Sequence, residues 1–422
     1  MTGDTKLPNA DWLQRRGLSA LIAALDGNAR YVGGAVRDTL LGQEVKDVDI
    51  ATPLLPANVM ERLRAADIKV IPTGIEHGTV TAVLPDGPVE ITTLRRDVST
   101  DGRRATVAFS DDWKEDAARR DFTINALFAD PETLAVFDYN GGLADLASRR
   151  IKFIGSASER IAEDHLRIMR YFRFLARFGR HDIDQETLDA CRSAASQLSK
   201  LSRERIADEL LKLLATDNPL YAVEEMIAAN IFRHIVREID PGAVQVLAPL
   251  MQREQAHGVA PGAVRRLVGL LPKDPEQAVE IAKSLRMSKK LQKAIATRLS
   301  ANVIPAKAGT QPKKDTSQDA IDPGLHGDEE KVGDAPTPAT IRALAYWHGK
   351  EAARDRALLF GVDVEIAAML EQLKGWEPPA FPITGGDLIA QGMEPGPKVS
   401  ETLASLERDW VENGFRMKET EV

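Results

Sequence analysis

The chain has 422 residues, of which 43% are hydrophobic and 28% charged, with a net charge of −8 and one cysteine, Cys191. This length exceeds a single compact core and predicts two or more domains, while the composition is that of an ordinary soluble protein. A lone cysteine excludes an intrachain disulfide and a cysteine-based metal site, and the acidic net charge argues mildly against a nucleic-acid binder, although local patches can differ from the sum.

The N-terminal region alternates between helical and strand patterns. Its first residues lack an apolar signal core and no apolar run approaches the length of a membrane span, so we expect a cytoplasmic protein. Residues 11–25 have helical spacing, and YVGGAV reads as a strand that ends in Gly33-Gly34 and leads into a helix. The stretches VKDVDIAT, IKVIPTG, GTVTAVL and VEITTLR resemble further strands. These patterns predict a mixed α/β region over residues 1–150.

Helical spacing dominates from residue 156 to about residue 301, without a convincing strand. Residues 303–338 are rich in Pro, Gly, Asp and Lys, which predicts a disordered linker or insertion, and helical patterns then continue to the end. The predicted fold class is therefore α+β, with a mixed α/β head followed by an elongated all-α part. The expected divisions are the head (1–150), a helical neck (151–215), a helical body (216–302), the linker (303–338) and a helical tail (339–422).

Glycine, arginine and aspartate residues cluster within residues 31–52. Residues i and i+2 of a strand share a face, so Asp47 and Asp49 would project together, and two such carboxylates repel each other unless a cation lies between them. Mg²⁺ is often held by one or two carboxylates plus substrate phosphates. The glycines would let backbone N–H groups approach an anion at a helix N-terminus, and Arg37 could bind a phosphate. Together these residues predict phosphoryl or nucleotidyl transfer.

Each part of this pattern also has a simpler interpretation. A Gly-Gly pair is usually a turn, and D-x-D is frequent by chance. A dinucleotide-binding loop needs G-x-G-x-x-G, which GGAVRD does not supply. The complete order G-G-x-V-R-D, L-L-G and D-x-D is much more specific than any one part.

These motifs resemble the signature of the polymerase-β-type nucleotidyltransferases, and within them the class II group of bacterial CCA-adding tRNA nucleotidyltransferases and poly(A) polymerases. Further stretches resemble blocks of this family in the same order, and the similarity is close from residue 30 to about residue 215. These blocks are RRDFTINAL (119–127), DYNGGLADL (138–146), EDHLRIMRYFRF (163–174) and SRERI (202–206), with TGGDLIAQGMEPGP (384–397) as a C-terminal element.

The resemblance implies that a tRNA 3′-hydroxyl attacks the α-phosphate of CTP or ATP. Asp47 and Asp49 would be the catalytic residues and would bind two Mg²⁺ ions, of which one lowers the effective pKa of the hydroxyl and the other binds the triphosphate and assists pyrophosphate departure. Glu90 is either a third acidic neighbour or a solvated charge. The implied nucleotide-binding residues are Gly33, Gly34, Arg37, Arg120, Asp164, Arg167, Arg170 and Arg173.

Asp164, Arg167, Arg170 and Arg173 are spaced by three, which on one helix would give a single stripe. The simpler interpretation is a solvated stripe with an Asp164–Arg167 ion pair. The resemblance implies instead that Asp164 accepts a hydrogen bond from the amino group of cytosine or adenine while Arg167 donates to the neighbouring acceptor, which would exclude guanine and uracil. Arg170 and Arg173 would reach phosphates or base faces.

The stretch 95–109 and the DYNGGLADL motif bear on which of three possible functions is expected. Residues 95–109 resemble the family's flexible loop and look complete, which favours full CCA addition over addition of CC only; DYNGGLADL is expected to be structural. CCA addition is preferred over poly(A) addition by the same chemistry, and the intact aspartates and arginines disfavour a non-catalytic RNA-binding protein. The expected partners are tRNA, CTP and ATP, with the helical part binding tRNA mainly through phosphates, and no membrane.

Overall fold

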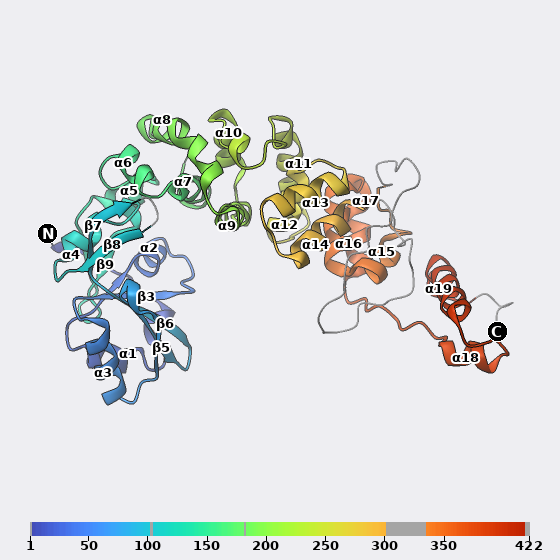
Figure 1. Cartoon of the computed structure of the whole chain (residues 1–422), viewed down its shortest axis with the longest axis horizontal. Coiled ribbons are helices and arrows are strands. Elements are labelled where there is room, and N and C mark those ends of the chain that lie inside the picture. The colour runs from blue at the N-terminus through green and yellow to red at the C-terminus, as the bar shows by residue number, and fades with distance from the viewer. Residues whose placement is uncertain (1, 102–103, 181–182, 301–334, 418–422) are drawn as a thin grey trace. The chain divides into compact units, whose positions relative to one another are not determined.

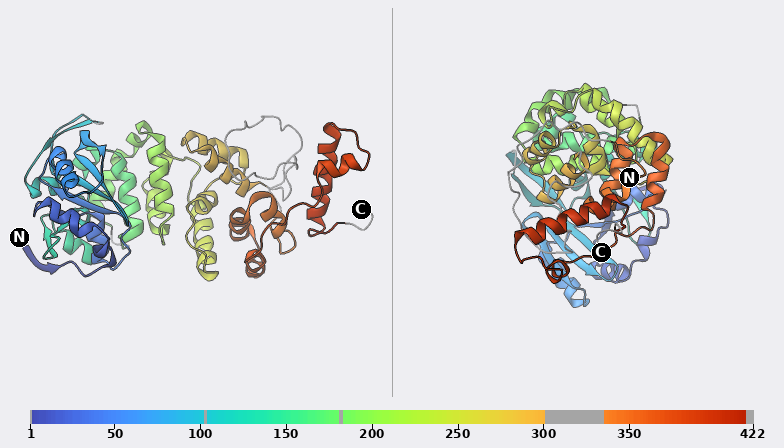
Figure 2. Two further views of the ribbon diagram at one scale, coloured as in Figure 1. Left: turned by 90° about the horizontal axis from the view of Figure 1, so that it is seen from below. Right: turned by 90° about the vertical axis from the view of Figure 1, so that its right-hand side faces the viewer.

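The computed structural model describes residues 2–101, 104–180, 183–300 and 335–417 and contains two compact units (Figure 1). The first unit is Met1–Glu209 with Asp217–Ile235, and the second is Leu210–Thr216 with Val236–Val422. The two further views of Figure 2 show that the strands are confined to the N-terminal part of the chain and that helices make up the remainder of what is described. The predicted α+β class is confirmed, and the finer division into five segments stays a prediction. Residues 303–334 of the predicted linker (303–338) lie outside the described residues.

The first unit is built on an eight-stranded sheet. Its strands, in the order in which they lie side by side, are β1 (Thr2–Lys6), β10 (Ala135–Asp138), β9 (Leu127–Ala129), β2 (Arg30–Val32), β3 (Val48–Thr52), β6 (Gly87–Thr93), β5 (Thr79–Leu84) and β4 (Val70–Gly74). Neighbouring strands are antiparallel except β3 and β6, which are parallel. The four stretches predicted as strands after residue 44 thus all contain strands.

A separate antiparallel hairpin follows the sheet in the sequence, formed by β7 (Arg95–Asp101) and β8 (Arg104–Phe109). This is the stretch that resembles a flexible loop, and its backbone forms a two-stranded ladder whose register shifts between Asp97 and Ser99.

Helices in the first unit surround the sheet and extend beyond it. They are η1 (Asp11–Gln14), α1 (Leu18–Leu25), α2 (Gly34–Leu40), α3 (Pro56–Ala65), η2 (Ile75–His77), α4 (Trp113–Ala118), η3 (Thr123–Asn125), α5 (Gly142–Ser148), α6 (Ala157–Glu163), α7 (Leu166–Phe178), α8 (Gln185–Ala194), η4 (Ala195–Lys200), α9 (Arg203–Leu214), α10 (Leu220–Ala228) and η5 (Phe232–His234). The last turn of α9, from Leu210 on, belongs to the second unit. The predicted helix over residues 11–25 is divided into η1 and α1, because Gly17 has a positive φ of 86° that ends the first turn.

One hydrophobic cluster of the first unit ties the sheet to the loops that carry the polar motifs. It contains Val32 at the end of β2, Ala51 of β3, Ala117 of α4, Ala126 and Phe128 of β9. Val32 is adjacent to Gly33, Ala51 is two positions from Asp49, and Ala117 is three positions from Arg120. Because buried side chains pack at crystal-like density, this cluster fixes the positions from which the polar side chains extend.

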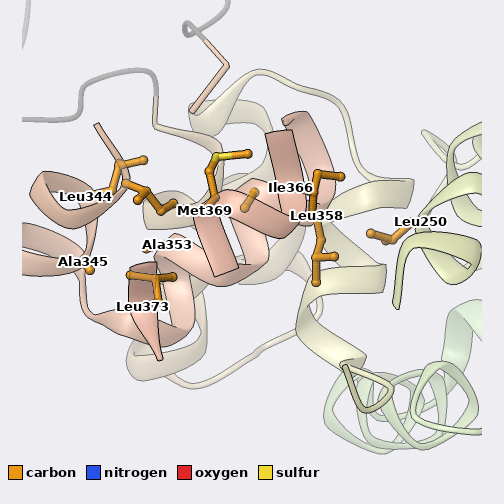
Figure 3. Close-up of a cluster of buried hydrophobic side chains, with 10 residues drawn as sticks. Leu250, Leu344, Ala345, Ala353, Leu358, Ile366, Met369 and Leu373 are labelled. Atoms are coloured by element: carbon orange, nitrogen blue, oxygen red, sulfur yellow. The ribbon is translucent and has the colours of Figure 1, made fainter. Parts of the chain in front are cut away.

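The second unit consists of helices in the described ranges. They are α11 (Gly242–Ala256), α12 (Ala263–Leu270), α13 (Pro275–Ser284), α14 (Lys289–Leu299), α15 (Ile341–His348), α16 (Lys350–Phe360), α17 (Asp363–Leu373), α18 (Gly385–Ala390) and α19 (Pro397–Glu412). Leu344 of α15, Leu358 of α16 and Met369 of α17 meet in one buried cluster, which Figure 3 shows together with Leu250 of α11. No helix in the described ranges is both long and apolar enough to cross a lipid bilayer.

Candidate active site

A cavity of about 620 Å³ lies in the first unit and collects most of the polar motifs. It is lined by Gly33, Gly34, Arg37, Asp49, Arg119, Arg120, Asp121, Asn125, Asp164, Leu166, Arg167, Arg170, Phe174, Arg205, Asp208 and Glu209. Basic residues therefore gather around a smaller number of carboxylates, an arrangement that suits an anionic ligand.

The glycine pair forms the turn between β2 and α2. Gly33 has a φ of 68°, which a residue with a side chain rarely adopts, and it precedes the first residue of α2, Gly34. A Cβ atom at Gly33 would lie 3.6 Å from a guanidinium nitrogen of Arg120. The sequence thus folds here as predicted, into a strand, a glycine turn and a helix, and this turn borders the cavity.

The two aspartates lie at the start of β3 with different exposure. Asp49 is on the strand and lines the cavity, whereas Asp47 comes just before the strand, is exposed and is not among the lining residues. Glu90 of β6 is the register partner of Asp49 on the adjacent strand. The pKa of Asp49 is raised to about 6, first by burial and then by the charge of Glu90, and the charge of Arg120 opposes this shift while that of Asp47 adds to it.

The carboxylates of Asp47 and Asp49 are suitable ligands for a divalent cation. Asp49 carries a charge that burial and two acidic neighbours disfavour, and a bound cation would relieve this. Among the described residues no three His, Cys, Asp or Glu side chains lie close enough together to hold a metal ion alone. The remaining ligands would therefore have to be water and substrate phosphates, which is the usual case for Mg²⁺.

Arg119 and Arg120 are held at the cavity by a buried carboxylate. Asp116 of α4 accepts hydrogen bonds from Arg119 at 2.6 and 2.8 Å through one oxygen and from Arg120 at 2.9 and 3.1 Å through the other. Burial alone would raise the pKa of Asp116, but the two arginines outweigh it and the pKa lies below its usual value. Burial lowers the pKa of Arg119 to about 10, and this side chain is still charged at neutral pH.

A second chain of hydrogen bonds connects α2 to α7 through the motif RRDFTINAL. Arg37 donates to Asn125, Asn125 donates to Asp121 at 3.0 Å, and Arg170 donates to the other oxygen of Asp121 at 2.9 Å. Burial opposes ionisation of Asp121, but Arg170 and the hydrogen bonds overcome this and keep its pKa low. Asp121 therefore holds Asn125 and Arg170 in place through its two carboxylate oxygens.

Asp164 and Arg167 both line the cavity, but they are not paired with each other. Asp164 has extended backbone between α6 and α7, and its carboxylate accepts from the backbone N–H of Leu166 at 3.0 Å and from Arg205 at 2.8 Å. Arg167 is instead paired with Glu163. The predicted single helical stripe is therefore wrong for Asp164, because its side chain caps the start of α7 and breaks the helix there.

The remaining arginines of α7 pair with acidic residues from other elements. Arg173 donates to Glu209 of α9 at 2.6 Å and does not line the cavity, whereas Arg170 does. Phe174 of α7 also lines the cavity, and its ring packs at a tilt against that of Phe122 with ring centroids 5.0 Å apart. These contacts fix the rotation of α7 about its axis and so determine which of its arginines face the cavity.

The motif DYNGGLADL shapes a turn rather than the cavity. Asp138 accepts hydrogen bonds from the backbone N–H groups of Gly142 and Leu143 at 3.0 and 2.9 Å, at the start of α5. A Cβ atom at Gly142 would lie 2.3 Å from the carbonyl oxygen of Thr123, so only glycine fits. The expected structural role of this motif is supported by these contacts.

The sequence did not single out some of the lining residues. Asp208 and Glu209 follow the SRERI block on α9 and carried no motif of their own, while Arg205 belongs to the block but had no assigned role. They reach the cavity because α9 packs near α7, and a contact between segments this far apart has no local signal. The resemblance of SRERI to a family block was the one available indication.

Comparisons with known proteins show to which family the chain is similar. Residues 29–152 match the family described as "Poly A polymerase head domain", and residues 182–242 match "Probable RNA and SrmB- binding site of polymerase A". The chain is 32% identical over 413 residues to the mouse protein "CCA tRNA nucleotidyltransferase 1, mitochondrial", covering 96% of this chain and 88% of that protein.

A bacterial relative and a solved structure extend the comparison. The CCA-adding enzyme of Streptococcus pyogenes is 44% identical over 209 residues, which cover 49% of this chain and 50% of the relative. The crystal structure of the Bacillus stearothermophilus CCA-adding enzyme in complex with CTP superposes with a TM-score of 0.67 and 26% identity, and the alignment covers 96% of this chain and 94% of that one.

Proposed function

We propose that this chain, which belongs to the class II family of CCA-adding enzymes and poly(A) polymerases, adds CCA to the 3′ end of tRNA from CTP and ATP and releases pyrophosphate. The observation that carries the proposal is that Asp49, Arg120, Asp164 and Arg167 all line one cavity of the first unit. A template-independent polymerase needs metal-binding carboxylates, cations for the triphosphate and a base-reading edge, and each requirement has a residue here.

The family uses divalent metal ions, and we assign Mg²⁺ to Asp47 and Asp49. Bound there, Mg²⁺ would activate the tRNA 3′-hydroxyl and stabilise the departing pyrophosphate, by two-metal nucleotidyl transfer. Asp49 contributes a carboxylate whose ionised form is disfavoured by burial and by the charges of Glu90 and Asp47. Asp47 contributes a carboxylate that is exposed to solvent. Both carboxylates must be ionised for this role.

Arginines and backbone groups of the cavity would position the triphosphate. Arg120 is fixed by Asp116, and its guanidinium lies beside Gly33 in the β2–α2 turn. Arg170, fixed by Asp121, presents a further cation from α7. Since these cations are already ordered, little side-chain freedom is lost when the triphosphate binds.

Base selection is assigned to Asp164 and Arg167. A carboxylate can only accept hydrogen bonds and a guanidinium can only donate them. Cytosine and adenine each present an amino group next to an acceptor nitrogen, whereas uracil and guanine present a carbonyl where the amino group would be. An edge made of one carboxylate and one guanidinium therefore favours CTP and ATP.

The helical region after the head would hold the tRNA through phosphate contacts, which makes binding sensitive to salt. The related chain in Bacillus stearothermophilus was solved with CTP, and the names of the relatives refer to tRNA. We also propose a cytoplasmic location, although the name of the mouse relative places that protein in mitochondria.

The deciding experiment incubates the purified protein with tRNA that ends at the discriminator base, Mg²⁺ and each labelled nucleotide. Addition of C, C and A followed by a stop supports the proposal. Long A tails would identify a poly(A) polymerase, and absence of incorporation with any nucleotide would refute nucleotidyl transfer.

A further inference from the structure

We infer that Arg205 is a positioning residue for base selection, acting by holding the Asp164 carboxylate in the orientation that reads the base. This inference rests on the function proposed above and adds a residue from a different helix to it. Arg205 belongs to α9, whereas Asp164 lies between α6 and α7, and both side chains line the same cavity.

The contacts of Asp164 leave its orientation dependent on Arg205. One carboxylate oxygen accepts from the backbone N–H of Leu166 at 3.0 Å, and the other accepts from the Arg205 guanidinium at 2.8 Å. With both oxygens held, the plane of the carboxylate is fixed. With only the first bond, the group can turn about its terminal torsion, which is broad for aspartate.

Arg167 does not provide this second restraint. Its guanidinium donates to the carbonyl oxygen of Arg160 at 2.8 Å and is paired with Glu163. The two base-reading groups are thus oriented independently, Arg167 by the last turn of α6 and Asp164 by α9. A base can contact both because neither uses the other as its partner.

Arg205 can stay in place when a base binds. A carboxylate oxygen offers two lone pairs, so the oxygen that accepts from Arg205 can also accept from an amino group of cytosine or adenine. A uracil or guanine carbonyl at this position would face an oxygen that offers only lone pairs. The ion pair therefore supports discrimination without having to break.

The Arg205–Asp164 ion pair is too exposed to contribute much to the stability of the fold, so the positioning role can be tested separately from folding. The side chains of Arg205 and Asp164 are 52% and 35% exposed, and ion pairs this exposed add little to stability. Substitution of Arg205 is therefore expected to leave the protein folded. What it removes is the fixed orientation of Asp164.

The test compares kcat/KM for CTP and UTP in the first addition to tRNA lacking CCA. Arg205→Met should lower the CTP-over-UTP ratio about fivefold, mainly by raising KM for CTP, because a correctly oriented acceptor is lost only for the cognate base. Arg205→Lys should restore part of the ratio, since its ammonium can still donate to Asp164. A merely structural role would lower kcat for both nucleotides together and leave the ratio unchanged.

The matched control is Arg192→Met, which removes a similarly exposed arginine paired with Asp189 at 2.7 Å outside the cavity. Its CTP-over-UTP ratio should equal that of the wild type. A double-mutant cycle adds a second readout: in an Asp164→Ala background, Arg205→Met should not change the ratio further. A change in that background would show that Arg205 acts on the nucleotide directly and would overturn the inference.

Failure of this inference and failure of the proposed function give different results. If the wild-type protein adds CCA selectively and Arg205→Met keeps the wild-type ratio, the positioning role is wrong while the function stands. If the wild-type protein does not distinguish CTP from UTP, the proposed function itself is wrong.

Discussion

Asp49 of β3 and Glu90 of β6 are register partners on adjacent parallel strands, so their side chains leave the sheet on the same face. Asp49 is half-buried, Glu90 is exposed, and the charge of Glu90 contributes to the raised pKa of Asp49, after burial itself. Like charges this close are unfavourable in the absence of a cation, and the protein retains them beside a cavity lined with arginines. A site that is unfavourable for the fold but suited to a ligand is typical of functional residues.

The first prediction is that Asp49→Asn stabilises the metal-free protein. The pKa of Asp49 is about 6 in the folded protein and near 3.8 when unfolded, so the ionised group destabilises the fold. Removing it should add about 1–3 kcal/mol to the free energy of unfolding above pH 6. This gain should shrink as the pH falls from 6 to 4 and vanish below, where the wild-type carboxyl is protonated in both states. Urea unfolding in EDTA across this pH range measures it.

Its control and its metal dependence make this prediction specific. Asp111→Asn, an exposed aspartate, should change stability little at any pH. Millimolar Mg²⁺ with CTP should raise the melting temperature of the wild type more than that of Asp49→Asn, because ligand binding stabilises only a state that can bind. Equal stabilisation of both proteins would argue against a metal at Asp49.

The second prediction is that Asp47→Ala abolishes nucleotide incorporation without unfolding the protein. Asp47 is exposed and precedes β3, so its side chain adds little to the fold. Loss of a metal-binding carboxylate should lower kcat by about a thousandfold or more. Glu44→Ala, which removes an exposed carboxylate from the same segment, should retain activity and serves as the control. Circular dichroism should be unchanged in both variants.

The sequence predicted the parts of the site that depend on local geometry. The Gly33-Gly34 turn, the strand carrying Asp49 and the caps of DYNGGLADL all follow from backbone preferences within a few residues. The break before α7 was missed, although an aspartate before an apolar run is a signal for a helix N-terminus. Here Asp164 caps Leu166, and this local contact outweighed the continuous helical pattern.

The pairing of charges could not be predicted, because it joins segments far apart in the sequence. Asp164 pairs with Arg205, Arg170 with Asp121, and Arg173 with Glu209 of α9. A spacing of three residues shows that side chains share a helix face, but it does not show which acidic groups other helices bring to that face. The alternative interpretation, an Asp164–Arg167 ion pair, is not found, because Asp164 pairs with Arg205 and Arg167 pairs with Glu163.

The third prediction is that Arg167→Ala loosens base choice more than it weakens triphosphate binding. Removing the donor leaves one half of the base-reading edge, so the CTP-over-UTP ratio of kcat/KM should fall about tenfold or more. Arg167→Lys should not restore it, because an ammonium lacks the planar fork. Wild-type discrimination by the alanine variant, together with weaker binding of every nucleotide, would assign Arg167 to the phosphates instead.

The fourth prediction concerns the glycine of the α5 turn. Gly142→Ala should lower the free energy of unfolding by about 2–4 kcal/mol, because the new Cβ would lie 2.3 Å from the Thr123 carbonyl oxygen, whose backbone cannot move freely. Gly386→Ala is the control: its Cβ would meet only a side-chain oxygen of Thr384 at 3.6 Å within α18, and alanine favours a helix. Urea unfolding followed by circular dichroism should show a large loss for the first variant only.

The fifth prediction tests a buried ion network in the second unit. Asp355 of α16 is 2% exposed and binds Arg265 of α12 at 2.5 Å and Arg298 of α14 at 2.8 Å, so it joins three helices. Asp355→Asn would leave two buried arginines without their shared carboxylate, which should cost about 3–5 kcal/mol. Asp363→Asn removes the exposed partner of Arg253, and the cost should be below about 1 kcal/mol.

Tryptophan fluorescence can follow this loss in the second unit, since Trp347, Trp376 and Trp410 lie there. The Asp355→Asn protein should unfold at lower urea concentration in this signal. The cost arises because both arginines are buried among helices and cannot reach water when the carboxylate is gone. If Asp355→Asn and Asp363→Asn unfold at the same urea concentration, the buried network contributes no more than a surface pair, and the packing of the apolar cluster alone would hold these helices together.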